Sequence, residues 1–145
     1  ITYADTFYDA IFTKKYLRKF NIDVAILNLS YFPSDKRVSD KVFKILSKYE
    51  FNIYIESAPK EFSLLSGILS ERVLKNIKDK SKNYFLSPKN IPAPADPKGM
   101  SLYYVNKNDI ILKVSKLLNK KIKIKKMSFE KSVLWPKIQL NKYLK

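Results

Sequence analysis

Cysteine and histidine are both absent from this sequence of 145 residues. Without thiols the chain cannot form disulfide bonds, and without thiols and imidazoles it lacks the usual ligands of a structural zinc ion. Catalysis by a thiolate or an imidazole is excluded for the same reason. Any chemistry of this chain must therefore use carboxylates, lysine, tyrosine or serine, or a bound cofactor.

Glycine is scarce too, since only Gly67 and Gly99 are present. The P-loop and GxGxxG motifs need several glycines at fixed spacing, so neither phosphate-binding loop can be written here. No apolar run approaches the ~18 residues of a membrane-spanning helix, and no secretory signal is recognisable at the start. We therefore expect a soluble, cytoplasmic protein, with an organelle matrix as the alternative. The opening Ile1-Thr2-Tyr3 lies in a β-prone run, as in a fragment or trimmed piece of a longer chain.

Charge of one sign dominates, with 29 basic and 13 acidic residues and a net charge of +16. Such a charge is compatible with a basic binding module for nucleic acid or for an acidic protein. Arginine, the preferred residue for bidentate phosphate and base recognition, occurs only at Arg18, Arg37 and Arg72. The lysines are spread along the whole chain. We therefore favour a solvated coat over a nucleic-acid site, and keep the binding module as the alternative function.

Apolar periodicity predicts strands and helices that alternate along the chain. Residues 22–29 are nearly all apolar, as in a strand covered on both faces, and residues 51–55 read as a central strand. This order implies parallel strands joined by right-handed crossovers, hence a three-layer α/β domain with helices on both faces of the sheet. The expected strands are 1–4, 22–29, 51–55 and 83–86; the expected helices follow Asp5 or Thr6, begin at Ser39 or Asp40, span about 63–77, and begin at Asn108-Asp109.

Two segments fall outside this alternation. Residues 87–99 hold four of the seven prolines and should form an extended loop that cannot join a β ladder. Residues 119–145 form a basic extension, in which residues 121–125 alternate like an edge strand protected by lysines. The rest of the extension is rich in apolar residues such as Trp135. We interpret it as a strap on its own domain, with an arm that docks on a partner as the alternative.

Polar residues follow several of the predicted strands. Glu56 ends the predicted central strand, and in parallel α/β sheets the carboxyl ends of the strands line the ligand crevice. A lone carboxylate there is more often a cap or an interface partner than a catalyst; a buried catalytic one would act as an acid, a base or a cation partner. With no metal cluster and no nucleophile–base pair, we assign no catalytic residue. The predicted polar rim comprises Asp5, Asn28, Ser30, Glu56, Ser57 and Ser87.

The order of these features resembles a known family. The stretches are ITYADTFYDAIFTKKYLRKFNIDVAILNLSYFPSD, KVFKILSKYEFNIYIESAP and NIPAPADPKGMSLYYVNKNDIILKVSKLL. Together they resemble the C-terminal domain of the transketolase family, closest to the β subunits of thiamine-diphosphate-dependent 2-oxoacid dehydrogenases. The resemblance covers residues 1–118 and leaves 119–145 as an extension without counterpart. The equivalent domain of 2-oxoacid:ferredoxin oxidoreductases is an alternative, although Pro92-Ala93-Pro94 followed by Tyr103-Tyr104 favours the dehydrogenase type.

The sequence also departs from that family. Asp5 stands where the family usually has glycine in the first strand–helix turn. Ser57 stands where a second acidic residue usually follows the glutamate, and residues 61–66 replace a glycine-rich turn. These departures indicate a divergent or non-catalytic member.

The resemblance implies a supporting role in a larger enzyme. In that family, thiamine diphosphate and its Mg²⁺ are held by other domains, so we expect this domain to bind no cofactor. The C-terminal domain helps the enzyme dimerise, shapes the substrate entrance and, in dehydrogenase complexes, contacts the acyltransferase core. We therefore expect a homodimer or a hetero-oligomer with the other subunits of such an enzyme. The residues expected at the interfaces are Pro92, Pro94, Tyr103, Tyr104 and Trp135.

Overall fold

The structure is a computed structural model that describes residues 1–2, 6–29, 36–59 and 82–124. Two parallel strands lie at the centre of its fold. Strand β1 spans Phe51–Ile55, as the sequence predicts, and β2 spans Lys82–Leu86, one residue longer than predicted. They pair in register from Phe51 opposite Lys82 to Ile55 opposite Leu86. Side chains of β1 alternate between the two faces of the sheet, so Asn52 and Tyr54 share one face and Ile53 and Ile55 the other.

The first residues of the chain add to the other side of β1. The Ile1 nitrogen donates a hydrogen bond to the Ile53 carbonyl at 2.6 Å, and the Ile55 N–H donates to the Ile1 carbonyl at 2.9 Å. Thr2 in turn forms a parallel bridge with Asn28. The spatial order is therefore the segment around Asn28, then Ile1 and Thr2, then β1, then β2, with all segments parallel. This confirms an α/β fold.

The segment 22–29 does not form the strand that was expected over its whole length. Only Asn28 is bridged, and Val24, Ile26 and Leu27 are half-buried while Ala25 is exposed. The physical reason is that Ile1 and Thr2 reach only the carboxyl-terminal part of the segment. Residues 22–26 have no paired strand beside them in the described part of the chain.

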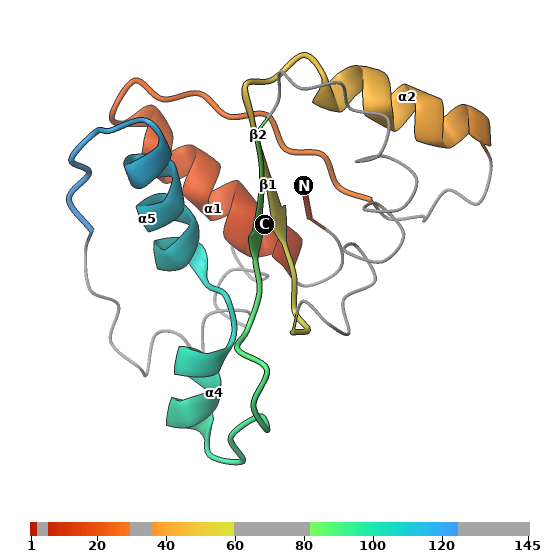
Figure 1. Cartoon of the computed structure of the whole chain (residues 1–145). Helices are drawn as coiled ribbons and strands as arrows, with labels where there is room; N and C mark the ends of the chain where they lie inside the picture. Colours follow the sequence, from red (N-terminus) through yellow and green to blue (C-terminus); the bar gives the residue numbers. More distant parts are fainter. Residues whose placement is uncertain (3–5, 30–35, 60–81, 125–145) are drawn as a thin grey trace, which may run out of the picture.

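Helices lie on both sides of these strands (Figure 1). Helix α1, Thr6–Arg18, and helix α5, Lys107–Leu117, lie on one side, and helix α2, Lys36–Leu46, on the other. Between α1 and α5 lies a core in which Leu17 is fully buried. A second cluster joins Ala10, Ile55 and Ile110. These two clusters fasten α1 and α5 to one face of β1.

The buried face of α1 differs from the expected aromatic stripe. The buried residues are Thr6, Ala10, Thr13 and Leu17, whereas Phe7, Ile11, Phe12, Tyr16 and Phe20 are only half-buried. Large apolar residues occur on more than one side of this helix, so periodicity did not identify the inward face. Small side chains at Ala10 and Thr13 permit closer packing of the helix.

Two helix starts lie earlier in the sequence than predicted. Helix α2 begins at Lys36, so the predicted caps Ser39 and Asp40 lie inside the helix. Helix α5 begins at Lys107 behind Asn106, whose side chain accepts the Asn108 N–H at 2.9 Å. The Asp109 carboxylate accepts the Asn106 N–H at 2.9 Å and completes a capping box. The predicted start at Asn108-Asp109 was therefore late, because Asp109 is the third residue of the helix.

The proline-rich segment is a loop as far as Asp96 and then forms the short helix α4, Pro97–Tyr103, which was not predicted. Beyond α5, Ile122 is buried and Ile124 packs on the same core, while Lys121 and Lys123 are exposed. The expected alternation is therefore present as extended chain without a ladder. Predictions that lie outside the described residues concern the helix at 63–77 and residues Asp5, Ser30 and Trp135.

Candidate functional site at the carboxyl edge of the strands

Glu56 directly follows β1 and is fully buried, with 0% of its surface exposed. Its backbone N–H donates to the Leu86 carbonyl at 2.9 Å, so its position continues the pairing with β2. By alternation its side chain shares a face with Tyr54 and Asn52, opposite the face that packs on α1 and α5. Burying a carboxyl group costs folding free energy unless hydrogen bonds offset its desolvation.

The same face of β1 carries two further buried polar side chains. Asn52 donates from Nδ2 to the Leu46 carbonyl at the end of α2, at 3.1 Å. The Tyr54 hydroxyl hydrogen-bonds to Oδ1 of Asn83 on β2 at 3.1 Å, and its ring stacks on Phe85 with centroids 4.7 Å apart. Burial raises the pKa of the Tyr54 hydroxyl to about 12. The side chains on this face of β1 therefore form a polar row, whose hydrogen bonds connect the strand to α2 and to β2.

A pair of buried threonines, which sequence reasoning missed, lies on the other face. Their hydroxyls, Thr2 Oγ1 and Thr6 Oγ1, hydrogen-bond to each other, and both residues are buried. Thr2 lies in the bridge with Asn28, and Thr6 is the first residue of α1. The signal in the sequence is a threonine at the expected start of a helix, where a hydroxyl commonly satisfies a backbone N–H.

The predicted polar rim is only partly assembled. Asn28 pairs with Thr2 and is half-buried, and Ser57 and Ser87 are half-buried near the ends of β1 and β2. Glu56 and the threonine pair lie on opposite faces of the sheet, so they do not form one pocket. Within residues 1–2, 6–29, 36–59 and 82–124, no three His, Cys, Asp or Glu side chains are grouped as potential metal ligands.

Beyond this edge projects a unit formed by residues 87–106, which includes α4 (Figure 1). The Tyr103 hydroxyl donates to the Ile91 carbonyl at 3.2 Å, and the Tyr103 and Tyr104 rings meet edge to face at 5.1 Å. Several apolar side chains of this unit face solvent, and Leu102 is 79% exposed. Of the predicted interface residues, Pro92 and Tyr104 are exposed and Pro94 and Tyr103 half-buried. The exposed apolar residues are Ile91, Met100, Leu102 and Tyr104.

Gly99 closes this projecting unit. Its N–H donates to Oδ1 of Asp96 at 2.7 Å, which caps α4. A Cβ atom at position 99 would lie 2.5 Å from Cβ of Pro94 and 2.6 Å from Oδ2 of Asp96. Only glycine allows the proline loop and α4 to approach this closely. The unit therefore has a defined shape held by its own contacts.

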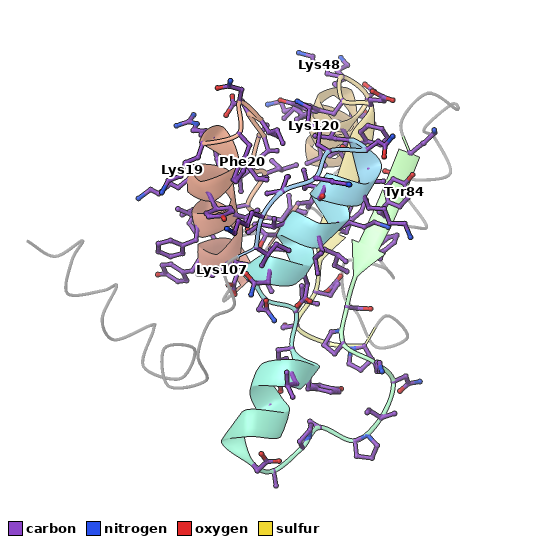
Figure 2. The ribbon with its side chains drawn as sticks, turned by 90° about the vertical axis from the view of Figure 1, so that its left-hand side faces the viewer. Lys19, Phe20, Lys48, Tyr84, Lys107 and Lys120 are labelled. Atoms are coloured by element: carbon purple, nitrogen blue, oxygen red, sulfur yellow. The ribbon has the colours of Figure 1, made fainter. Side chains whose placement is uncertain are left out.

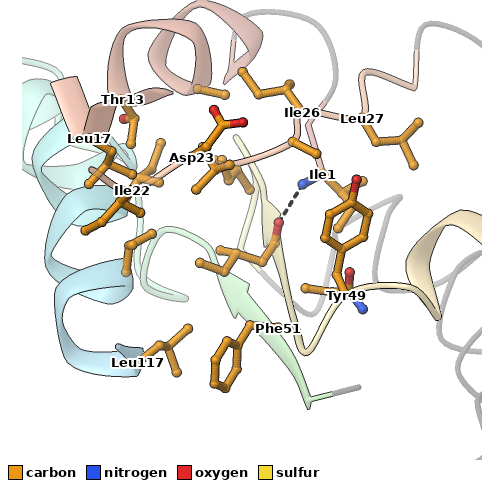
Figure 3. Close-up of a pocket in the computed structure, with 18 of the residues that line it drawn as sticks. Ile1, Thr13, Leu17, Ile22, Asp23, Ile26, Leu27, Tyr49, Phe51 and Leu117 are labelled. Carbon is orange, nitrogen blue, oxygen red and sulfur yellow. Dashed lines mark hydrogen bonds between the residues drawn. The ribbon is translucent and has the colours of Figure 1, made fainter. Parts of the chain in front are cut away.

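A cavity of about 470 Å³ lies at the opposite, amino-terminal end of the strands (Figure 3). Its lining is mostly apolar and comes from segment 22–27, from the beginning of β1, from Ile1 and from helices α1, α2 and α5. Of the predicted rim, the four residues that the structure describes, Asn28, Glu56, Ser57 and Ser87, do not line it. This cavity is therefore separate from the polar carboxyl edge.

Lysines also gather towards the amino-terminal end. Lys19, Lys48 and Lys120 each follow the end of a different helix, and all three lie in the upper part of Figure 2. Positive charge at helix carboxyl termini is favoured by the helix dipole. The fold thus concentrates lysines that are far apart in the sequence at one end of the molecule.

Comparison with protein-family models and with curated proteins gave no match to this chain. In the part of the chain that the structure describes, every helix is too short or too polar to cross a bilayer.

Proposed function

We propose that this chain is the C-terminal supporting domain of a thiamine-diphosphate-dependent 2-oxoacid dehydrogenase β subunit, or of a related transketolase-like enzyme. The α/β fold, the buried Glu56 directly after β1 and the proline-rich unit that precedes α5 support the proposal. We also propose that residues 1–118 form a three-layer transketolase-type domain and that residues 119–145 form a basic extension. In this role the chain contributes assembly rather than chemistry.

The observation that carries the proposal is the exposed apolar surface of the projecting unit. An isolated exposed leucine is ordinary, but four apolar side chains on one compact unit mark an interaction surface. Ile91 is 54% exposed and Leu102 79% exposed, although the backbone between them is held by the Tyr103 contact and the Gly99 approach. A preformed apolar surface loses little entropy on binding, which favours a stable subunit contact.

Thiamine diphosphate and Mg²⁺ are assigned to the other domains or subunits of the parent enzyme. The proposal gives this chain no catalytic step of its own. Glu56 then stabilises the carboxyl edge of the sheet next to the projecting unit. The partner that the proposal names is the subunit or domain that binds thiamine diphosphate, with an acyltransferase core as a further contact.

The test is to purify the tagged chain from the cells that produce it and to measure thiamine diphosphate and 2-oxoacid-dependent reduction of an artificial electron acceptor. Both should co-elute with the chain. Leu102→Lys should abolish co-elution, because it places a charge in the apolar contact. Leu112→Lys is the matched control, since Leu112 is an exposed leucine on α5, outside the unit. Recovery of the folded chain without thiamine diphosphate would overturn the proposal.

The lysines at the amino-terminal end favour a second candidate, a basic module that binds nucleic acid. If about three lysines contact phosphates, affinity for a duplex should fall about 40-fold between 50 and 200 mM salt. The variant Lys19→Gln/Lys120→Gln should weaken binding, while Lys89→Gln/Lys107→Gln, away from that end, should not. Absence of binding at 50 mM salt would exclude this candidate.

A further inference from the structure

The cavity at the amino-terminal end lies in line with the short strand of Ile1 and Thr2. On one side it is lined by residues 23–27 and on the other by Phe51, Asn52 and Ile53. Figure 3 shows Ile1 between these two walls, with its nitrogen directed to the Ile53 carbonyl. Past that nitrogen the two walls continue, with the cavity between them. The hollow therefore lies where the strand would extend by a few residues.

The hydrogen bonds of Ile1 and Thr2 fix the register of such an extension. Ile1 bonds to the Ile53 carbonyl and the Ile55 N–H, and Thr2 to the Leu27 carbonyl and the Leu29 N–H. Parallel ladders repeat every two residues. The residue before Ile1 would then meet the Ala25 carbonyl and the Leu27 N–H, and the one before that the Phe51 carbonyl and the Ile53 N–H.

These four backbone groups face the cavity. The Lys82 N–H donates to the Glu50 carbonyl and the Glu56 N–H to the Leu86 carbonyl. The backbone N–H and C=O groups of the even-numbered residues of β1 therefore point towards β2. The Phe51 carbonyl and the Ile53 N–H, which belong to odd-numbered residues, therefore point towards the cavity. Among the described residues, the Leu27 N–H and the Ala25 carbonyl make no backbone hydrogen bond. Both walls thus offer strand-pairing groups in one register.

The side chains that line the cavity are mostly apolar, like those of a protein core. Ile45 and Tyr49 line it, and they remain 40% and 43% exposed. Val24, Ile26 and Leu27, which the sequence marks as part of a doubly covered strand, are only half-buried. A strand between the walls would cover all of them, because successive side chains of a strand point to opposite faces. The apolar lining of the cavity and the backbone groups on its two walls thus both fit an extended apolar strand.

The position of the Ile1 nitrogen agrees with this occupant. Burial lowers the pKa of the Ile1 amino group to about 5, so a charged ammonium is disfavoured there. A peptide N–H in the same place would donate to the Ile53 carbonyl without carrying a charge.

We propose that the cavity is a strand-acceptor slot, filled by an extended polypeptide segment that is joined to Ile1 and continues its strand between residues 23–27 and β1. The segment runs parallel to both walls and carries apolar side chains towards both faces. A separate peptide or an apolar small molecule would not share the register that Ile1 and Thr2 set. The slot follows from the sheet geometry and does not depend on the proposed function.

The test compares three forms of the full chain: one that starts at Ile1, one extended by Ser-Val-Val-Val, and one extended by Ser-Val-Pro-Pro. Proline cannot donate a hydrogen bond, so the third form is matched in length but cannot complete the ladder. Amide hydrogen exchange of Leu27 and Ile53 should slow about tenfold or more only with Ser-Val-Val-Val. Exchange in the β1–β2 ladder, at Tyr54, reports that each form is folded.

A second measurement uses the absence of cysteine. Ile45→Cys introduces a single thiol in the cavity wall, and its labelling by a maleimide should slow about tenfold in the Ser-Val-Val-Val form. Equal exchange and equal labelling in all three forms would overturn the proposal. So would loss of folding with Ser-Val-Val-Val alone, since a segment in the fitting register must stabilise the sheet. Dodecanoate bound equally well with and without that extension would show a small-molecule site instead.

Discussion

Removing one hydroxyl from β1 should produce a stability difference that reverses sign with pH. The Tyr54 hydroxyl is buried and hydrogen-bonds to Oδ1 of Asn83 at 3.1 Å. In Tyr54→Phe the stack on Phe85 is kept and one hydrogen bond is lost. A buried hydrogen bond contributes about 1 kcal/mol net, so near pH 7 the variant should be less stable by about that amount.

Above pH 10 the balance changes, because the folded state keeps Tyr54 protonated. Burial raises the pKa of this hydroxyl to about 12, whereas the unfolded chain titrates near 10. Between these values the native state binds more protons, so stability is lost as pH rises. Two pKa units correspond to at most about 3 kcal/mol, and about 1 kcal/mol is lost by roughly pH 10.7. The variant lacks this group and should become the more stable form above roughly pH 10.5 to 11.

The assay is urea denaturation of both proteins from pH 7 to 11.5, followed by circular dichroism. All other side chains are common to both proteins, so the stability difference between them isolates Tyr54. Tyr8→Phe, which removes a hydroxyl from an exposed side chain, should follow the wild type throughout. A Tyr54→Phe difference that stays constant from pH 7 to 11.5 would refute the burial of this hydroxyl.

Three further outcomes are expected. Gly99→Ala should strain the projecting unit by about 1–3 kcal/mol, because its Cβ would meet Pro94, and hydrogen exchange in α4 should rise while β1 is unaffected. Leu17→Ala should lower the free energy of unfolding by about 2–5 kcal/mol in urea titrations, against less than about 0.5 kcal/mol for the exposed control Leu112→Ala. In the form that starts at Ile1, the amino pKa of about 5 lies below its unfolded value of 8.0, so the unfolded state binds more protons between these values. Stability should then fall from pH 8 to 5 by at most about 4 kcal/mol, and acetylation of the amine should abolish that slope.

The sequence predicted the elements whose signal is local. β1 was predicted at its observed bounds, because alternating polar and apolar residues between turn-forming neighbours suffice for a strand. Helix α4 was missed, because its start depends on the Asp96 cap and on the close approach of Gly99 to Pro94, neither of which is periodic. Local signals thus identify elements but not the contacts that start and shape them.

The candidate site was predicted in part for a related reason. Glu56 was placed correctly at the end of β1, because a position relative to one strand follows from that strand alone. The face on which each rim residue lies depends on how neighbouring segments pair, and sequence spacing does not contain this pairing. The Thr2–Thr6 pair therefore went unnoticed, and the rim divided between two faces of the sheet. The cavity was not foreseen, since it depends on how far Ile1 and Thr2 extend between their neighbours.

The polar row on β1 also restricts the register in which this strand can pair. Asn52, Tyr54 and Glu56 alternate with Ile53 and Ile55, so a slip by one residue would exchange every buried polar group for an apolar one. If β1 were misaligned by one residue, Glu56 would be buried against α1 and α5, where the native fold places Ile55. The alternation along β1 therefore specifies a single pairing register. A specified register disfavours mispairing and the aggregation that would follow from it, although the strands are very short.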